Sequence, residues 1–521
     1  MAQIIGGGAA VAPLHLVPDE IINHLLYYIS PSDNLSGLQL VSRRFNRLAN
    51  EPLLWKYHCC SNFQYWHPTH KFHDKVTRLV EHTDWKRLFI LRISRNERIA
   101  TLLNDIISTK VGRIKRFEQI AQLGYDAKDF LLEQCQTDPS LDDGLATRYY
   151  SNAILDSIHR SIAIEEWHSL QQVPEQHMSQ VTGVQLERAL GAFDLFVLHD
   201  QPGDLDDITY MLDEVAFSFR SSQPNFHELT TRQKALTLLR WLRSQNFTGV
   251  HNPERNYRNL RNCLIGQALR HEEHESIPII STAIFCCIAS RLGMDTRCCA
   301  FPSHVHAIVY PAPGYTLDDL PVKPKQRNDP PQRMFLDPYG NDEEVPAYAL
   351  RAMLAQFGWQ TNMEVFLAPV SALSITMRTA QNLKATIARI QELNDHVHSE
   401  LSQLIRGDNA MNVEACLYAA SWASLVLTPP NSLEWVDRLA KFLRRFAGSW
   451  PEDAWLIEKY LWPSPSTGPE PHVVAAHNIE LISDPNLVTD DMFPLAGKFF
   501  KRFDTKTCTF ISNIKEQFPD D

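Results

Sequence analysis

The chain of 521 residues carries 50 Lys and Arg against 61 Asp and Glu, a formal net charge of −11. A chain of this charge has no overall field that attracts nucleic acid or anionic lipid, so we expect no membrane partner and no nucleic-acid partner. The ten Cys contain no C-x-x-C pair, which favours reduced thiols and a location in the cytoplasm, the nucleus or both.

Residues 1–13 are small and apolar with three consecutive Gly, which predicts a disordered leader. The next residues, 14–60, predict a compact helical unit. Pro18 suits a first helical turn because its missing N–H is not needed there, and Asp19 and Glu20 are favourable at the positive end of the helix dipole. A later helix is expected to present one apolar face, made by Leu35, Leu38, Val41, Phe45 and Leu48.

So small a unit has more apolar positions than its own core can bury, and we expect some of them to bind a partner. The order of its residues resembles the F-box family, with Val17 in place of the usual first Leu. The matching positions are Val17-Pro18-Asp19-Glu20-Ile21, Leu38, Val41, Arg43, Arg44, Phe45 and Leu54-Trp55.

This resemblance implies docking on a Skp-type adaptor, which connects to a cullin and a RING protein. It implies the following adaptor-facing residues: Pro18, Ile21, Ile22, Leu25, Leu38 and Val41. An ordinary three-helix unit packed on the rest of the chain remains an alternative. A helix-turn-helix is a further alternative, although the sequence has no tight Gly-containing turn between two suitable helices.

Residues 61–145 alternate charged and apolar groups at helical spacing and predict a helical connector, which ends in a polar linker from Gln136 to Gly144. In the following region, residues 146–370, helical stretches are expected first. An apolar helix is then predicted at residues 279–292, and short strands are predicted at Val305–Tyr310 and Met334–Leu336. The Pro-rich residues between the two strands, 311–331, predict an exposed loop.

Several motifs in this central region share their order with a known family. They are Asn262-Cys263-Leu264, Ser276-Ile277-Pro278-Ile279-Ile280-Ser281, Arg291-Leu292-Gly293, Phe301-Pro302-Ser303-His304 and Leu336-Asp337-Pro338. The order resembles the SirB-type transglutaminase-like family, over roughly Tyr149 to Trp359. The resemblance implies a papain-like domain, and F-box proteins of the transglutaminase-like class join the two modules in this order.

A working site of this kind needs a Cys thiolate at a helix N-terminus, a His that activates it and an Asp that orients the His. The expected first helical turn, Pro278 to Ser281, contains no Cys. We therefore expect a degenerate, non-catalytic domain. If catalysis does occur, the candidate residues are Cys263, His304 and Asp337.

His271 and His274 have helical spacing but sit among acidic residues, which favours a solvated face. His304 and His306 are predicted on one side of a strand, where the second could line a cleft. The sequence has no nucleotide, zincin or calcium motif, so we predict no metal site and no cofactor.

Residues 371–521 return to helical periodicity, with a long amphipathic helix expected from Ser374 to Leu404. F-box proteins of this class often end in a barrel that resembles hemimethylated-DNA-binding (YccV-like) domains. We do not find its sequence pattern here, so a helical C-terminal region is expected instead.

The sequence as a whole predicts a mostly helical α+β protein, with a three-helix F-box, a degenerate transglutaminase-like domain and a helical C-terminal region. The expected function is substrate recognition in an SCF-type cullin–RING ubiquitin ligase, acting on an unknown protein substrate. The alternative is a cysteine-dependent acyl-transfer or protease-like enzyme that uses Cys263, His304 and Asp337. A scaffold that binds the adaptor without turning over a substrate is a third possibility.

Overall fold

The computed structural model describes residues 16–172, 183–302, 304–322, 332–395, 411–430, 432–446 and 448–461. The protein is a mostly helical α+β chain with one small sheet, as the sequence predicts. It forms two compact units, Met1–Ile158 and His159–Asp521. Within the described ranges, no helix has both the length and the apolar character needed to cross a membrane.

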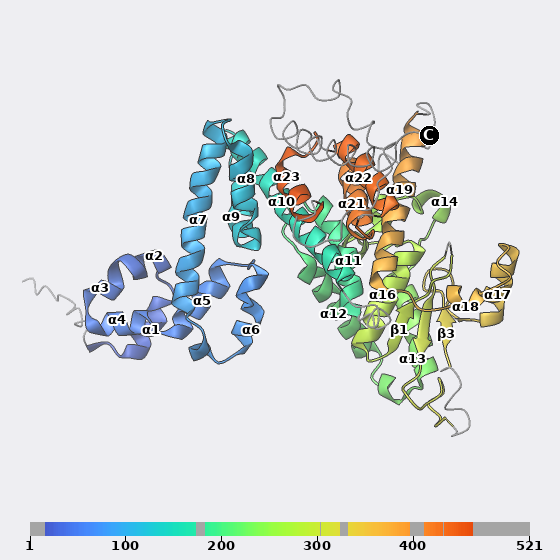
Figure 1. Cartoon of the computed structure of the whole chain (residues 1–521). Helices are drawn as coiled ribbons and strands as arrows, with labels where there is room; N and C mark the ends of the chain where they lie inside the picture. Colours follow the sequence, from blue (N-terminus) through green and yellow to red (C-terminus); the bar gives the residue numbers. More distant parts are fainter. Residues whose placement is uncertain are drawn as a thin grey trace, which may run out of the picture. The chain divides into compact units, whose positions relative to one another are not determined.

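The described part of the first unit, residues 16–158, is all-helical (Figure 1). Its helices are α1 (Asp19–Leu26), α2 (Pro31–Asp33), α3 (Gln39–Val41), α4 (Arg43–Ala49), α5 (Pro52–Asn62), α6 (Phe72–Thr77), α7 (Trp85–Ser108), α8 (Arg113–Ala121) and α9 (Lys128–Cys135). The boundary with the second unit falls inside α10 (Gly144–Gln171), so the predicted division after residue 145 lies in the first turn of a continuous helix.

The chain between α1 and α5 corrects one prediction. In place of a single helix with one apolar face, it forms α2, a π-helical turn (Asn34–Leu38), α3 and α4. Ser42 separates α3 from α4 with an extended backbone, and its hydroxyl accepts a hydrogen bond from the Phe45 N–H at 3.2 Å. Ser is a preferred N-cap residue. Because the helix restarts there, Val41 is 67% exposed whereas Leu48 is 1% exposed.

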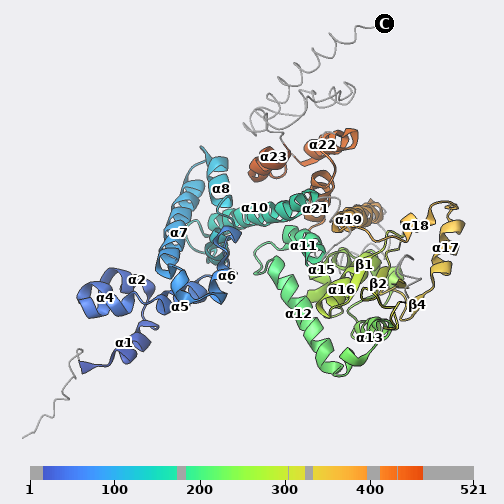
Figure 2. The same cartoon turned by 60° about the horizontal axis from the view of Figure 1, so that its bottom comes forward.

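The second unit places helices around a sheet, as Figure 2 shows. Its helices are α11 (Gly183–Asp194), α12 (Leu205–Ser222), α13 (Thr231–Ser244), α14 (Pro253–Asn256), α15 (Ile265–Arg270), α16 (Pro278–Arg291), α17 (Ala347–Gln356), α18 (Met363–Phe366), α19 (Ala372–Asp395), α21 (Val413–Val426), α22 (Leu433–Phe446) and α23 (Ala454–Leu461). Its strands are β1 (Asp295–Cys298), β2 (Ala307–Tyr310), β3 (Met334–Leu336) and β4 (Glu344–Val345).

Helix α16 is the centre of this unit. It is apolar on all sides, and every residue from Pro278 to Ala289 is buried, as expected of a helix that is hydrophobic all round. The sheet has the order β1-β2-β3-β4 with antiparallel neighbours. Helix α16 packs against β1 and β2, so the central helix and the sheet share one core.

The predicted apolar helix and the predicted strands correspond to α16, β2 and β3 within two residues at each end. Of the predicted helix from Ser374 to Leu404, the described part is α19, which ends at Asp395. The predicted leader, residues 323–331 of the predicted Pro-rich loop and residues 462–521 lie outside the described residues.

Candidate functional site

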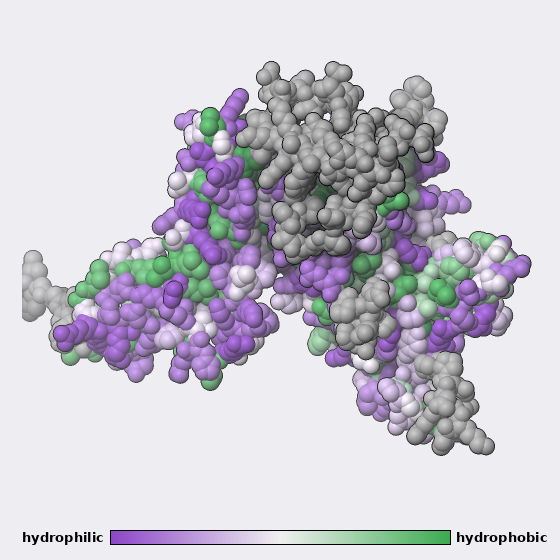
Figure 3. All heavy atoms as spheres, in the orientation of Figure 1, coloured by the Kyte–Doolittle hydropathy of each residue, from purple (hydrophilic) through white to green (hydrophobic). Residues whose placement is uncertain are grey.

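The first candidate site is the outer surface of helices α1 to α5. Their small core is made by Ile22, Leu26, Leu48 and Leu54, and it leaves other large apolar side chains in solvent. The exposed ones are Leu16, Ile21, Leu25, Tyr28, Leu40, Val41, Leu53 and Tyr57. Figure 3 shows apolar side chains gathered over this part of the molecule. Exposed apolar groups in such number are typical of an interaction surface.

Most residues predicted to face an adaptor lie on this surface. Pro18, Ile21, Leu25 and Val41 are exposed, and Leu38 is half-buried against the core. The expectation for Ile22 was wrong, because its side chain is 3% exposed and belongs to the core of the unit. Its place on α1, one residue from exposed Ile21, turns it inward.

Sequence reasoning missed five exposed residues of this surface: Leu16, Tyr28, Leu40, Leu53 and Tyr57. Leu40 is 74% exposed because it precedes the break at Ser42, which ends the expected helical face. Leu53 lies in the first turn of α5 and directly follows Pro52. The Pro52 signal for a helix start could have placed Leu53 on the outer side of that turn.

The second candidate site lies where β2 begins and β3 ends. The two strands are antiparallel, and Ala307 pairs with Leu336. One residue beyond this pair, His306 therefore lies opposite Asp337. His304 is two residues before His306 in the same segment, and its ring lies near the Asp337 carboxylate.

The geometry of this site is a His–Asp pair. The Nε2 of His304 lies 2.8 Å from the Oδ1 of Asp337, which also accepts hydrogen bonds from the N–H groups of Tyr339 and Gly340. Burial alone would raise the pKa of Asp337, but the hydrogen bond from His304 and the nearby imidazoles outweigh it and lower the pKa. The carboxylate thus stays ionised and fixes the His304 ring.

His306 has a different environment. Its Nδ1 lies 3.0 Å from the backbone carbonyl of His304, and its ring contacts Phe301 edge-on. Burial is the main reason that the pKa of His306 is lowered to about 4, so the ring is neutral near pH 7. The sequence placed His306 beside a cleft but gave no reason to expect this buried, neutral state.

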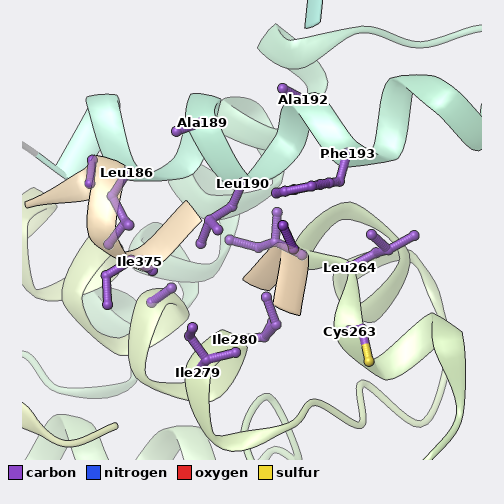
Figure 4. Packing of buried hydrophobic residues seen from close by; sticks show 14 of the residues in the cluster. Leu186, Ala189, Leu190, Ala192, Phe193, Cys263, Leu264, Ile279, Ile280 and Ile375 are labelled. Carbon is purple, nitrogen blue, oxygen red and sulfur yellow. The ribbon is translucent and has the colours of Figure 1, made fainter. Parts of the chain in front are cut away.

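Cys263 does not join the His–Asp pair. Its side chain is fully buried, and its Sγ contacts the Asn259 carbonyl at 3.7 Å and the Thr386 hydroxyl at 3.8 Å. Figure 4 shows the sulfur within the packed interior beside Leu264. Burial raises the pKa of this thiol to about 11, so it is protonated at neutral pH. Among the described contacts, none connects Cys263 with His304 or Asp337.

The start of α16, where a catalytic Cys is expected, is occupied by Ser281. Its hydroxyl accepts a hydrogen bond from the Gly249 N–H at 3.0 Å and lies 3.0 Å from the Ser276 carbonyl.

Cys286 and Cys287 lie deeper in the same helix, and both thiols have a pKa raised well above the ordinary value. Close contact with Cys298 and burial raise the first, and burial raises the second.

Comparison with protein families identifies the two domains to which these candidate sites belong. A family model described as the transglutaminase-like superfamily matches residues 206–381, and one described as F-box-like matches residues 14–61. The chain joins an F-box-like domain to a transglutaminase-like domain. The comparisons with curated proteins and with solved structures gave no match. The first match covers α12 to α19 in part and includes all four strands, so the His–Asp pair belongs to the transglutaminase-like domain.

Proposed function

We propose that this protein is the substrate-recognition subunit of an SCF-type cullin–RING ubiquitin ligase. The F-box-like domain would bind the Skp-type adaptor, and through it the cullin and the RING protein, in the cytoplasm or the nucleus. The observation that carries this proposal is the set of exposed apolar side chains on α1 to α5 of a domain that matches the F-box-like family.

The energetics of that surface favour a protein partner. Burying a side chain such as Ile21 or Leu25 is worth about 1.5–3 kcal/mol, and that gain is unrealised while the residue is in water. Exposed Leu40, Val41 and Leu53 add to the same surface. A partner with an apolar groove would therefore bind it with a large hydrophobic contribution.

The transglutaminase-like domain is proposed to bind rather than to catalyse. It keeps the hydrogen-bonded His304 and Asp337, but the buried, protonated thiol of Cys263 is not placed as a nucleophile. The helix start has Ser281 in a closed hydrogen-bond network. Without a nucleophile to deprotonate, the His–Asp pair has no group to activate and no acyl-enzyme can form.

A protein substrate would bind the central and C-terminal regions, and α17 with α18 supports this part of the proposal. Helix α17 buries only Leu350 and Leu354, although most of its other residues are apolar. Its exposed aromatic neighbours include Phe357 and Trp359. The exposed Asp342 and Glu343 precede this surface, which suits a substrate segment that combines apolar residues with Lys or Arg.

The test is affinity purification of the full chain, with the proteasome inhibited, comparing wild type with the double variant Ile21→Lys, Leu25→Lys. We expect the variant to lose the adaptor, the cullin and the RING protein by about 100-fold or more, because two apolar anchors become charged. The matched control is Val111→Lys with Leu141→Lys, two exposed apolar residues of the same unit outside the F-box-like domain. Undiminished adaptor binding by the first double variant would overturn the assignment.

A second comparison tests the substrate side. Phe357→Asp with Trp359→Asp should leave the adaptor bound while reducing ubiquitination of those proteins whose half-lives lengthen when the F-box-like domain is inactivated. If no protein changes its half-life in either variant, the chain acts as a scaffold. The enzyme alternative is favoured only by the retained His304–Asp337 pair and is tested by thiol labelling, as described in the Discussion.

A further inference from the structure

Three side chains at the junction of β2 and β3 each present a metal-binding atom to the same small space. His304, His306 and Asp337 offer one ring nitrogen or carboxylate oxygen each, and these atoms lie within 4.8 Å of one another. The antiparallel pairing of Ala307 with Leu336 holds the three together, since His306 and Asp337 are the next residues beyond that pair.

The hydrogen bonds of His306 and Asp337 leave one lone pair of each residue free in this space. The Nδ1 of His306 faces a backbone carbonyl at 3.0 Å, and a carbonyl can only accept, so Nδ1 carries the proton and Nε2 keeps its lone pair. Metal-binding His residues usually donate their other N–H to a carbonyl or carboxylate in this way. His306 is therefore already oriented as a ligand.

Asp337 is arranged in a similar way. Its Oδ1 is opposite His304 Nε2 and accepts the N–H groups of Tyr339 and Gly340, whereas no described group donates to Oδ2. Gly340 keeps the space beside Oδ2 open, because a Cβ at that position would lie 2.7 Å from this oxygen. The free carboxylate oxygen thus faces a volume that a side chain at position 340 would fill.

We propose that His304, His306 and Asp337 form a binding site for a divalent transition-metal ion, for which Zn²⁺ is the best probe. Two imidazoles and one carboxylate suit Zn²⁺ or Fe²⁺, and oxygen-preferring Mg²⁺ and Ca²⁺ are poorly matched by such a set. Three protein ligands leave a coordination position for water. This proposal differs from the expectation made from the sequence, which named no metal site.

Occupation has a structural consequence. At bond lengths of about 2.0–2.2 Å, tetrahedral ligand atoms are about 3.3–3.6 Å apart, so the three side chains must close around the ion. The ion would connect the residues before β2 with those after β3. Because it binds the folded chain, it would also raise the melting temperature of the second unit.

The experiment uses the full chain, stripped with a chelator and titrated with ZnCl₂ by calorimetry, with bound metal counted by mass spectrometry. We expect wild type to bind one more equivalent of Zn²⁺ than Asp337→Asn or His306→Gln, and the melting temperature of wild type alone to rise by several degrees. Excess Mg²⁺ should not displace the ion. Gly340→Ala keeps all three ligands and should weaken Zn²⁺ binding at this site at least tenfold, because its Cβ crowds Oδ2.

The matched control is His251→Gln, which removes an exposed His that lies 3.7 Å from the Glu275 carboxylate in the same unit. The His251→Gln chain should still bind the equivalent of Zn²⁺ that Asp337→Asn and His306→Gln lose. Equal stoichiometry and affinity in wild type, Asp337→Asn and Gly340→Ala would overturn the proposal. Asp337→Asn and Gly340→Ala change few atoms, so a comparison between folded chains is available even if His306→Gln unfolds. Adaptor binding is measured separately and does not depend on this outcome.

Discussion

In the F-box-like domain, the side chains with the most to gain from a partner, such as Ile21 and Leu25, are in solvent. In the transglutaminase-like domain, side chains that could act as nucleophiles, such as Cys263 and Cys287, are in the core. The first arrangement leaves binding energy unused until a partner arrives. The second keeps thiols protonated and out of reach. The difference supports the proposal that the chain binds partners rather than acting as a cysteine-dependent enzyme.

Removing Trp55, which packs with Trp85 and Phe89 of α7 beneath the F-box-like domain, should break this comparison most strongly. Trp55 is fully buried and its indole N–H donates to the Ala49 carbonyl at 2.7 Å. Trp55→Ala should lower the free energy of unfolding of the first unit by about 3–5 kcal/mol, because it leaves a cavity and an unpaired carbonyl. Denaturant unfolding measures the change. The control is Leu53→Ala, which alters an exposed residue of the same helix and should change the free energy of unfolding by less than about 0.5 kcal/mol. A Trp55→Ala chain of wild-type stability would show that the packing of Trp55 against α7 contributes little to the first unit.

A partly buried Lys between α19 and α21 tests how apolar the interior of the second unit is. Lys384 lies on α19, two residues from the Thr386 that contacts Cys263, and donates to the Ser424 hydroxyl at 2.7 Å. Burial is the main cause that lowers its pKa to about 8. Between pH 8 and about 10.5 the unfolded chain binds a proton that the folded chain does not, so stability rises with pH in that range.

Lys384→Met should therefore be more stable than wild type at pH 7, by up to ~3 kcal/mol, and the difference should disappear as the pH approaches about 10. The measurement is the free energy of unfolding of both chains from pH 7 to 10. The control is Lys441→Met, because Lys441 is an exposed residue that pairs with Asp437 on α22. A difference that does not depend on pH would mean that Lys384 is well solvated.

The break at Ser42 permits a smaller test on the F-box side. Its hydroxyl caps α4, and the loss of such a cap costs about 1 kcal/mol. Ser42→Ala should lower the stability of the first unit by that amount and leave the exposed apolar residues unchanged, so adaptor binding should persist. Ser32→Ala, at an exposed position of α2, serves as the control. If Ser42→Ala were neutral, the restart of the helix would have another cause.

Ser42 also marks where sequence reasoning reached its limit. Apolar spacing was enough to place α16, β2 and β3, since a buried helix and short strands have strong patterns. It could not reveal the break at Ser42, because a cap and a mid-helix Ser look alike in a sequence without tertiary contacts. The pairing of His304 with Asp337 followed from the family resemblance, whereas the burial of Cys263 against α19 depends on contacts 123 residues apart in the chain.

The smallest expected effect separates a receptor from an enzyme. Of the described thiols, Cys60 is the exposed one, so it should react first with iodoacetamide at neutral pH, although partial burial raises its pKa. Cys263 should remain unlabelled in the native chain, and neither Cys263→Ala nor His304→Ala should change the labelling of the other described thiols. Peptide mass spectrometry of native and denatured chains gives the measurement. Rapid native labelling of Cys263 that is lost in His304→Ala would require an activated thiolate, because a thiol with a pKa of about 11 is almost entirely protonated at pH 7. That result would support a catalytic transglutaminase-like domain, independently of what the F-box-like domain binds.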